Sequence, residues 1–337
     1  MLLLGAGATR GGLRTKPIPP PVDADFFEIA GQIKGHGTPK LAGLVLNDVW
    51  RLYGRVAGIG LENYYRDVET RESISSFAKT VNQPKNWKKR KHLLEELIRR
   101  VIIHATCELD KNGHLRPLKS EPHNRILARL TDEDTILTFN YDTLIEESFG
   151  RDTVWTPRGG YGDGVHGITA HWCKRWFKDR EIPSLQKSTV RLLKLHGSIN
   201  WTTYKTGHVK LKDRPFVVRA GWEEKVSILP PGWNKKINIH PYKLLWKEAR
   251  LRLEQCQTLI IIGYSLPEAD LLAKALFSEV VRSRGARNDY LKQLHLADPI
   301  DSVKQKFIDL FAPAMNARSK LFRYRDVNEF VEVNARE

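Results

Sequence analysis

Three polar side chains, an amide, a carboxylate and an imidazole, come directly after apolar segments of this 337-residue chain. Asn140 and Asp142 follow the run 135–139, and His196 follows the run 192–195. In an open parallel sheet, ligands bind beyond the carboxyl ends of the strands. If both runs are strands of one sheet, the three side chains converge at its edge, and such a set suits the cleavage of a glycosidic bond.

Each of these motifs also has a purely structural explanation. An Asn-x-Asp turn is common in proteins, and a single histidine at a strand end is often a structural residue that its neighbours satisfy. Both interpretations stay open for each residue taken alone. The presence of all three groups at strand ends is what favours an enzyme.

The first residues, Met1-Leu-Leu-Leu-Gly-Ala-Gly-Ala-Thr9, form an apolar run that breaks into glycines. This pattern is typical of a buried strand that leads into a phosphate-binding turn. Glycines let the backbone approach a pyrophosphate, and amide groups with the following helix terminus can hold its charge. Arg10 stands where the Gly-x-Gly-x-x-Gly fingerprint has its third glycine. A tight surface turn therefore explains the segment about equally well.

The elements that must position these groups alternate between helix and strand. Apolar residues at helical spacing predict a long amphipathic helix over 87–109 and shorter helices over 41–53, 74–81 and 143–149. The C-terminal part predicts helices over 242–253, 267–284 and 301–311, and strands over 258–262, 291–297 and 321–324. Pro267 suits the first turn of its helix. This order predicts an α/β fold, a Rossmann-like doubly wound parallel sheet.

We expect one catalytic domain over residues 1–337 with two kinds of addition. Residues 23–131 are mostly helical and stand between the first strand and the strand that ends at Phe139, which predicts a helical insertion. Residues 150–190 and 202–238 show no sustained period and contain turn residues. They predict loop-rich segments of a small subdomain, with short polar strands or hairpins in the second.

The composition is that of a soluble globular protein, with 41% hydrophobic and 28% charged residues. No apolar run approaches the ~18 residues that a membrane span needs. The leading Met-Leu-Leu-Leu is too short for a signal peptide, so we expect a cytoplasmic protein. Three isolated cysteines, Cys107, Cys173 and Cys256, support neither a zinc ribbon nor a disulfide framework.

A formal net charge of +16 indicates an acidic partner or ligand. The densest basic cluster, Lys85-Asn-Trp-Lys-Lys-Arg-Lys-His92, begins the long predicted helix. Two interpretations of this cluster stay open. It is either a solvated helix face or a surface for DNA, RNA or an acidic protein partner.

Together the motifs resemble those of the sirtuin superfamily, and specifically its bacterial branch that acts in anti-phage defence. Gly5-Ala-Gly-Ala-Thr9 is similar to the opening motif, and Thr138-Phe-Asn-Tyr-Asp142 to the strand-end motif around the nicotinamide ribose. Leu195-His-Gly-Ser198 resembles the catalytic histidine motif. Ile262-Gly-Tyr-Ser-Leu-Pro-Glu-Ala-Asp270 resembles the phosphate-contacting segment in the form that this branch uses. Further similarity lies in Ile199-Asn-Trp201, Pro230-Pro231 and Trp246-Lys-Glu-Ala249.

The chain departs from the sirtuin deacetylases in three places. It lacks their four zinc-binding cysteines, and Phe139 replaces the glutamine before their asparagine. Pro20-Pro-Val-Asp-Ala-Asp-Phe-Phe27 stands in place of their Pro-Asp-Phe-Arg segment. These departures weigh against an acyl-lysine site but not against the dinucleotide. We therefore expect NAD+ as the substrate and no zinc.

The resemblance implies a role for each motif residue. His196 would act as general base towards a ribose hydroxyl or water, Asn140 would orient the attacking water and the ribose, and Asp142 would accept from the carboxamide. The residues near the pyrophosphate would be Gly5, Ala6, Gly7, Gly263 and the hydroxyl donors Thr9 and Ser265. Asp298 would bind the adenosine ribose or cap the following helix, and Asp270 would hold the Gly263 loop.

The resemblance implies an NAD+ glycohydrolase that depletes NAD+ on phage infection, which is abortive infection. Such an activity is lethal unless controlled, and the expected catalytic fold takes up almost the whole chain. We therefore expect control by homo-oligomer assembly or by a partner in trans, such as a hexameric DNA-translocating ATPase or a short Argonaute. Two alternatives stay open. One is a protein deacylase or ADP-ribosyltransferase, and the other is a non-catalytic nucleotide-binding subunit of a defence complex.

Overall fold

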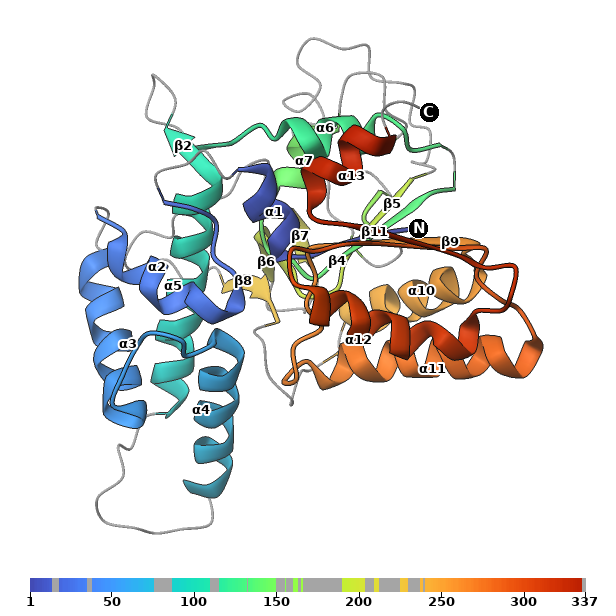
Figure 1. Cartoon of the computed structure of the whole chain (residues 1–337). Coiled ribbons are helices and arrows are strands. Elements are labelled where there is room, and N and C mark those ends of the chain that lie inside the picture. The colour runs from blue at the N-terminus through green and yellow to red at the C-terminus, as the bar shows by residue number, and fades with distance from the viewer. Residues whose placement is uncertain are drawn as a thin grey trace.

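The computed structural model describes residues 1–13, 18–34, 38–75, 87–109, 115–131, 133–149, 155, 160–162, 165, 190–203, 209–211, 225–229, 237–238 and 240–334. Within these residues the chain forms a six-stranded parallel sheet with helices on both faces, a cluster of helices beside it and two small antiparallel sheets (Figure 1). The predicted Rossmann-like α/β fold is confirmed.

The central sheet has the strand order of dinucleotide-binding folds. Its strands are β1 (Leu2–Leu4), β4 (Thr135–Thr138), β5 (Arg191–Lys194), β9 (Thr258–Ile262), β10 (Gln293–Ala297) and β11 (Lys320–Tyr324). In space they follow the order β11-β10-β9-β1-β4-β5, and all pairs are parallel. Counted along the chain, this is the 3-2-1-4-5-6 order. The order of strand addition reverses between β1 and β9, where such sheets bind their ligands.

Helices cover both faces of the sheet, which is why its two central strands, β1 and β9, are almost continuously apolar. One layer contains α1 (Ala6–Gly12), α6 (Glu121–Leu127), α7 (Leu144–Ser148) and α13 (Val327–Asn334). The other contains α10 (Tyr242–Gln255), α11 (Leu271–Arg287) and α12 (Asp301–Phe311), followed by the short turn η2 (Ala312–Ala314) (Figure 1). A single apolar core runs through these layers.

A second apolar core lies in the helices between β1 and α6. This helical cluster consists of η1 (Asp23–Asp25), α2 (Phe26–Gln32), α3 (Thr38–Tyr53), α4 (Leu61–Ser75) and α5 (Trp87–Thr106). The helix α5 buries Leu94, Leu97, Ile98 and Val101, which are spaced to form one face of a helix. Figure 1 shows the cluster standing beside the sheet. The predicted helical character of this segment is thus present, while its status as an insertion stays a prediction.

Two small antiparallel sheets complete the described structure. β2 (Cys107–Leu109) and β3 (Leu115–Pro117) form a hairpin after α5. β6 (Gly197–Thr203), β7 (Val209–Leu211) and β8 (Lys225–Ile228) form a sheet in the order β7-β6-β8. The last two strands lie in the segment for which short strands were predicted. Most of residues 150–190, Pro230-Pro231 and residues 85–86 of the basic cluster lie outside the described residues.

Several predicted elements have different bounds in the structure. The long helix ends at Thr106, because the hairpin strand β2 begins at Cys107. The predicted helix 74–81 overlaps only the end of α4, and its residues 76–81 lie outside the described residues. The helix predicted from Pro267 begins at Leu271, because the carboxylate of Asp270 caps it. The glycine-rich segment is not a turn but the helix α1, and α13 was not predicted.

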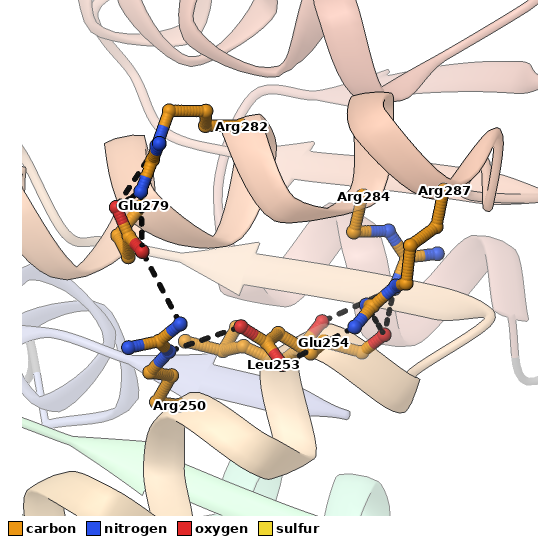
Figure 2. Close-up of polar contacts among 7 residues, drawn as sticks. All are labelled: Arg250, Leu253, Glu254, Glu279, Arg282, Arg284 and Arg287. Atoms are coloured by element: carbon orange, nitrogen blue, oxygen red, sulfur yellow. Dashed lines mark hydrogen bonds and ion pairs between the residues drawn. The ribbon is translucent and has the colours of Figure 1, made fainter.

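A buried arginine joins α10 and α11 (Figure 2). Arg284 is fully buried and donates from one guanidinium nitrogen to the carbonyl oxygens of Leu253 at 3.2 Å and Glu254 at 2.9 Å. It thereby satisfies carbonyls at the C-terminal end of α10 that have no partner within that helix. Figure 2 also shows the more exposed Arg250 between Glu254 and Glu279, an arrangement that contributes less because water screens it.

None of the helices in the described part of the chain combines the length and the apolar character that crossing a membrane requires.

Candidate active site

The carboxyl ends of the central strands lie in register. Leu4 of β1 pairs with Thr138 of β4, and Thr138 pairs with Lys194 of β5. Asn140 and His196 each stand two residues beyond one of the paired residues Thr138 and Lys194. The structure therefore brings Asn140 and His196 to equivalent positions at the same edge of the sheet, as predicted, while their chemical roles stay predictions.

Glycines bring the loops after β1 and β9 into direct backbone contact. The amide of Gly5 donates to the carbonyl of Ile262 at 3.0 Å, and the amide of Gly7 donates to the carbonyl of Gly263 at 2.8 Å. Gly263 has a φ of 62°, and a Cβ atom there would lie 2.1 Å from the amide nitrogen of Ala8. Side chains are therefore excluded from this contact. The amides of Gly5 and Gly7 bind the last residue of β9 and the residue after it, and the predicted place of both glycines beside a pyrophosphate stays a prediction.

A single hydroxyl joins the two candidate polar residues after β4. The side-chain amide of Asn140 donates to the Thr9 hydroxyl at 3.1 Å, and that hydroxyl donates to Asp142 Oδ2 at 3.0 Å. The other carboxylate oxygen of Asp142 accepts from the Leu144 amide at 3.0 Å. All three polar residues are buried. Thr9 thus connects α1 with the strand-end motif, while its predicted role as a donor to phosphate stays a prediction.

The backbone of the strand-end motif is fixed by a second hydroxyl. Thr138 donates from Oγ1 to the carbonyl of Leu4 at 2.7 Å, and the same oxygen accepts from the Asn140 amide at 3.1 Å. This hydroxyl thus holds the backbone of Asn140, whose side chain contacts Thr9 of α1. Sequence reasoning missed this residue, although a buried threonine at the end of an apolar run is a recognisable sign of such a bond.

His196 lies almost completely buried in an aromatic environment. Its ring is 4.9 Å from the ring of Phe139 and 6.2 Å from that of Tyr141, measured between centroids. Trp246 of α10 lies 6.5 Å away and donates from its indole nitrogen to the carbonyl of Leu195 at 3.2 Å. Aromatic walls exclude water and strengthen electrostatic interactions with the imidazole.

Asp270 is the charged group next to this imidazole. Its Oδ2 lies 3.5 Å from His196 Nε2, and both side chains are at most 4% exposed. The same oxygen accepts from the Tyr264 hydroxyl at 3.0 Å, while Oδ1 accepts from the Ala273 amide at 3.4 Å. Burial and the Asp270 carboxylate raise the pKa of Tyr264 well above its usual range, so this hydroxyl stays a donor. Asp270 therefore supports His196 as well as the loop after β9.

The contact between Asp270 and His196 was not predicted. The sequence indicated that Asp270 holds the Gly263 loop, and the bond from Tyr264 in that loop agrees with this. The two residues are 74 positions apart in the chain, and no local pattern relates them. Only the tertiary fold brings the segment after β5 close to the N-terminal end of α11.

The remaining candidates, Ser265 and Asp298, follow β9 and β10. Ser265 is exposed in the loop after β9, and its carbonyl accepts from Lys306 at 3.3 Å. Asp298 follows β10, and its carboxylate accepts from the Ile300 amide at 2.9 Å. Burial raises the pKa of Asp298. Asp298 thus shapes the turn before α12 but is not the cap residue of that helix, which is Ile300.

Among the described residues, no group of three or more histidine, cysteine, aspartate or glutamate side chains is arranged to hold a metal ion. Cys107 is buried and Cys256 is partly buried, and both are free thiols. Cys173 lies outside the described residues. The described part of the site therefore offers an amide, carboxylates and an imidazole for chemistry.

A Rossmann-type sheet with glycines at its reversal point and polar groups beyond its strand ends is typical of nucleotide-binding proteins. A family model described as a SIR2-like domain matches residues 134–311, which is more than half of the chain. The chain belongs to this SIR2-like family, whose domains bind NAD+ and are in general NAD-dependent enzymes. Comparison with curated proteins gave no match.

Proposed function

We propose that this protein is an NAD+ glycohydrolase, which cleaves the bond between nicotinamide and ribose. The observation that carries the proposal is the approach of Asn140, Asp142 and His196 to one sheet edge, beside the glycine contact between β1 and β9. Membership of the SIR2-like family supports NAD+ as the substrate.

The proposed reaction requires little acid catalysis. The bond between ribose C1′ and the ring nitrogen breaks through an oxocarbenium-like state. Its electron pair moves to the nicotinamide ring and neutralises the positive charge, so no proton is needed to expel this group. A water oxygen then bonds to C1′ and loses a proton, which gives ADP-ribose.

His196, Asn140 and Asp142 would each have a separate role in this reaction. His196 would accept the proton of the water or of a ribose hydroxyl, since histidine is the side chain that most often serves as a general base. Asn140 would orient the water and the ribose, and Asp142 would accept from the carboxamide NH2. Asp270 would stabilise the imidazolium that forms, because its carboxylate lies at ion-pair distance.

Two features disfavour protein deacylation. The sequence contains three cysteines, fewer than the four that bind zinc in the deacetylases. Phe139, in the position of their glutamine, stacks on Tyr264 with centroids 4.5 Å apart and closes that position with an aromatic pair. Hydrolysis of NAD+ by water needs no peptide site.

We further propose that the activity serves anti-phage defence in the cytoplasm and depletes NAD+ on infection. Constitutive depletion would kill the cell, so the enzyme would be restrained until it assembles or meets a partner. The formal net charge of +16 favours an acidic partner protein or a nucleic acid that a partner protein holds. Such a partner would be a DNA-translocating ATPase or a short Argonaute.

The test is NAD+ consumption by the purified protein, resolved by chromatography, alone and with the product of a neighbouring gene. We expect nicotinamide release that falls roughly 10²–10⁴-fold in His196→Ala and Asn140→Ala. The control is His295→Gln, because His295 is also buried but its ring nitrogens contact Tyr324 and Gln293 of the far strands. A folded protein that binds NAD+ without turnover in either condition would favour the non-catalytic subunit instead.

A further inference from the structure

A buried ion pair lies directly behind the candidate site. Lys194 is the last residue of β5, Glu146 stands in α7, and neither side chain has any exposed surface. The ammonium of Lys194 lies 2.9 Å from Glu146 Oε1. Lys194 interrupts the otherwise apolar run Leu192-Leu-Lys-Leu195, which is unusual for a strand buried on both faces.

The same ammonium also binds the backbone of the site itself. Lys194 Nζ donates to the carbonyl oxygen of Asp142, the residue whose carboxylate meets Thr9. On the other side of the pair, the Tyr161 hydroxyl donates to Glu146 Oε1 at 2.9 Å. Burial and the Glu146 carboxylate raise the pKa of Tyr161 well above its usual range, so it remains a donor.

Stability alone does not account for this pair. Moving two charges out of water costs several kcal/mol per ion, and apolar residues of similar size often serve a core as well or better. The second oxygen of Glu146, Oε2, is buried and has no hydrogen-bond partner among the described residues. The pair is therefore incompletely satisfied, which points to a geometric role rather than an energetic one.

The geometry of that role follows from the chain. Lys194 precedes His196 by two residues on β5, and its ammonium holds the carbonyl of Asp142 after β4. The lysine thus connects the strand that carries the proposed base with the loop that carries the proposed carboxamide acceptor. Glu146 directs the lysine side chain through their contact of 2.9 Å. Glu146 itself lies in α7, the helix that begins just after Asp142.

We propose that Lys194, directed by Glu146, is a positioning residue that sets Asp142 relative to His196 and so aligns the nicotinamide end of the substrate. This inference rests on the proposed function for the role of Asp142. It predicts different effects on the binding of the two parts of the substrate. Loss of the Lys194–Glu146 pair weakens the binding of the nicotinamide part but leaves the binding of the ADP-ribose part unchanged.

The experiment compares NAD+ with ADP-ribose, which lacks nicotinamide, in the full chain. The double variant Lys194→Met/Glu146→Gln removes both charges together, so no single buried charge is left to unfold the protein. We expect its affinity to fall about tenfold for NAD+ and to stay within about twofold for ADP-ribose. We expect kcat to fall about 10²-fold with a smaller change in KM, as for a misplacement of ~1 Å.

The matched control is Arg284→Met, which removes an equally buried cation near the C-terminal end of α11 (Figure 2). A purely structural loss would lower stability and change the affinities for both nucleotides together. We therefore expect the ratio of the NAD+ and ADP-ribose affinities to stay unchanged in Arg284→Met. An equal ratio in the double variant and the wild type would overturn the proposal.

Hydrogen exchange separates this inference from the proposed function. In the double variant we expect backbone amides of residues 140–146, including the Leu144 amide that binds Asp142, to exchange about tenfold faster than in the wild type. This increase is expected even if the wild type neither cleaves nor binds NAD+, an outcome that would defeat only the proposed function. Unchanged exchange at these amides would overturn the positioning role.

Discussion

The imidazole of His196 and the carboxylate of Asp270 lie 3.5 Å apart, although they come from the end of β5 and the start of α11. Both side chains are buried, and the carboxylate is held in place by Tyr264 and by the first turn of α11. A fixed carboxylate beside a base stabilises the imidazolium that forms as the base takes a proton. The helix cap and the support of the proposed base are thus the same residue.

The substitution Asp270→Asn separates these two tasks. Asparagine caps helices as well as aspartate does, so the free energy of unfolding should change by less than about 1 kcal/mol. The charge beside His196 is lost, and NAD+ cleavage should fall about tenfold or more, as when about 1.4 kcal/mol of charge stabilisation disappears. Steady-state kinetics and urea unfolding measure the two quantities.

A double-mutant cycle shows whether Asp270 acts through His196. In a His196→Ala background, the further change Asp270→Asn should leave the residual rate unaltered. An additional tenfold loss in that background would mean that Asp270 acts independently of the imidazole.

The Thr9 hydroxyl is expected to matter for both stability and activity, because it is the bridge between Asn140 and Asp142. Thr9→Val keeps the shape of the side chain but leaves a buried amide and a buried carboxylate with one partner fewer. We expect a loss of about 1–3 kcal/mol in unfolding free energy and a lower kcat. Thr9→Ser keeps the hydroxyl and should stay close to the wild type. Equal stability and activity of the two variants would show that the bridge is unimportant.

The sequence was sufficient to predict the parts of the fold that depend on local pattern. Apolar strands and amphipathic helices have a period that the chain displays, and the C-terminal strands fall within two residues of their predicted limits. Asn140 and His196 could be predicted to lie at the same edge of the sheet because strand ends in a parallel sheet share an edge. The Lys194–Glu146 pair has only a faint sequence signal, a charge inside an apolar run.

Contacts that depend on three-dimensional packing could not be predicted. The approach of Asp270 to His196 depends on where the fold places the N-terminal end of α11 relative to the residues after β5, and no residue spacing encodes that. The contacts of Thr9 could not be predicted for a related reason, while its role near a pyrophosphate stays a prediction. A hydroxyl after a glycine-rich segment suits phosphate, but here the helix α1 turns it towards the loop after β4.

Gly263→Ala should be among the most damaging single changes near the site. The residue has a left-handed φ, and the added Cβ would meet backbone atoms of Gly7 and Ala8 at 2.4 and 2.1 Å. Backbone atoms cannot rotate away as a side chain can, so the loops after β1 and β9 must separate. We expect a large fall in the melting temperature and loss of NAD+ binding.

The control for this change is Gly58→Ala. Gly58 also has a left-handed φ, of 71°, but nothing lies within 4 Å of the added Cβ. Its substitution should cost only the conformational penalty of about 1–2 kcal/mol. The difference in unfolding free energy between the two variants therefore measures the cost of the close contact, and equal losses would contradict it.

His123 should make the stability of the protein depend on pH. This side chain on α6 is 1% exposed, and its Nδ1 lies 2.7 Å from the Ser120 hydroxyl. Burial lowers the pKa of His123 to about 4, although the charge of Asp142 acts in the opposite direction. Space is also tight, because Gly12 approaches both Ser120 and the His123 ring. The native protein therefore holds the imidazole in its neutral form.

In the unfolded chain this imidazole takes up a proton near its ordinary pKa of 6.5, while the folded protein resists protonation until about pH 4. Between these values the unfolded state binds more protons, so stability falls as the pH drops through this window. From pH 7.5 to pH 5, the wild type should lose about 2 kcal/mol more unfolding free energy than His123→Gln, which has no group that titrates there. Urea unfolding at the two pH values measures this difference, and the other histidines cancel because both proteins contain them. Identical pH dependence in the two proteins would mean that His123 titrates in the folded state as it does in water.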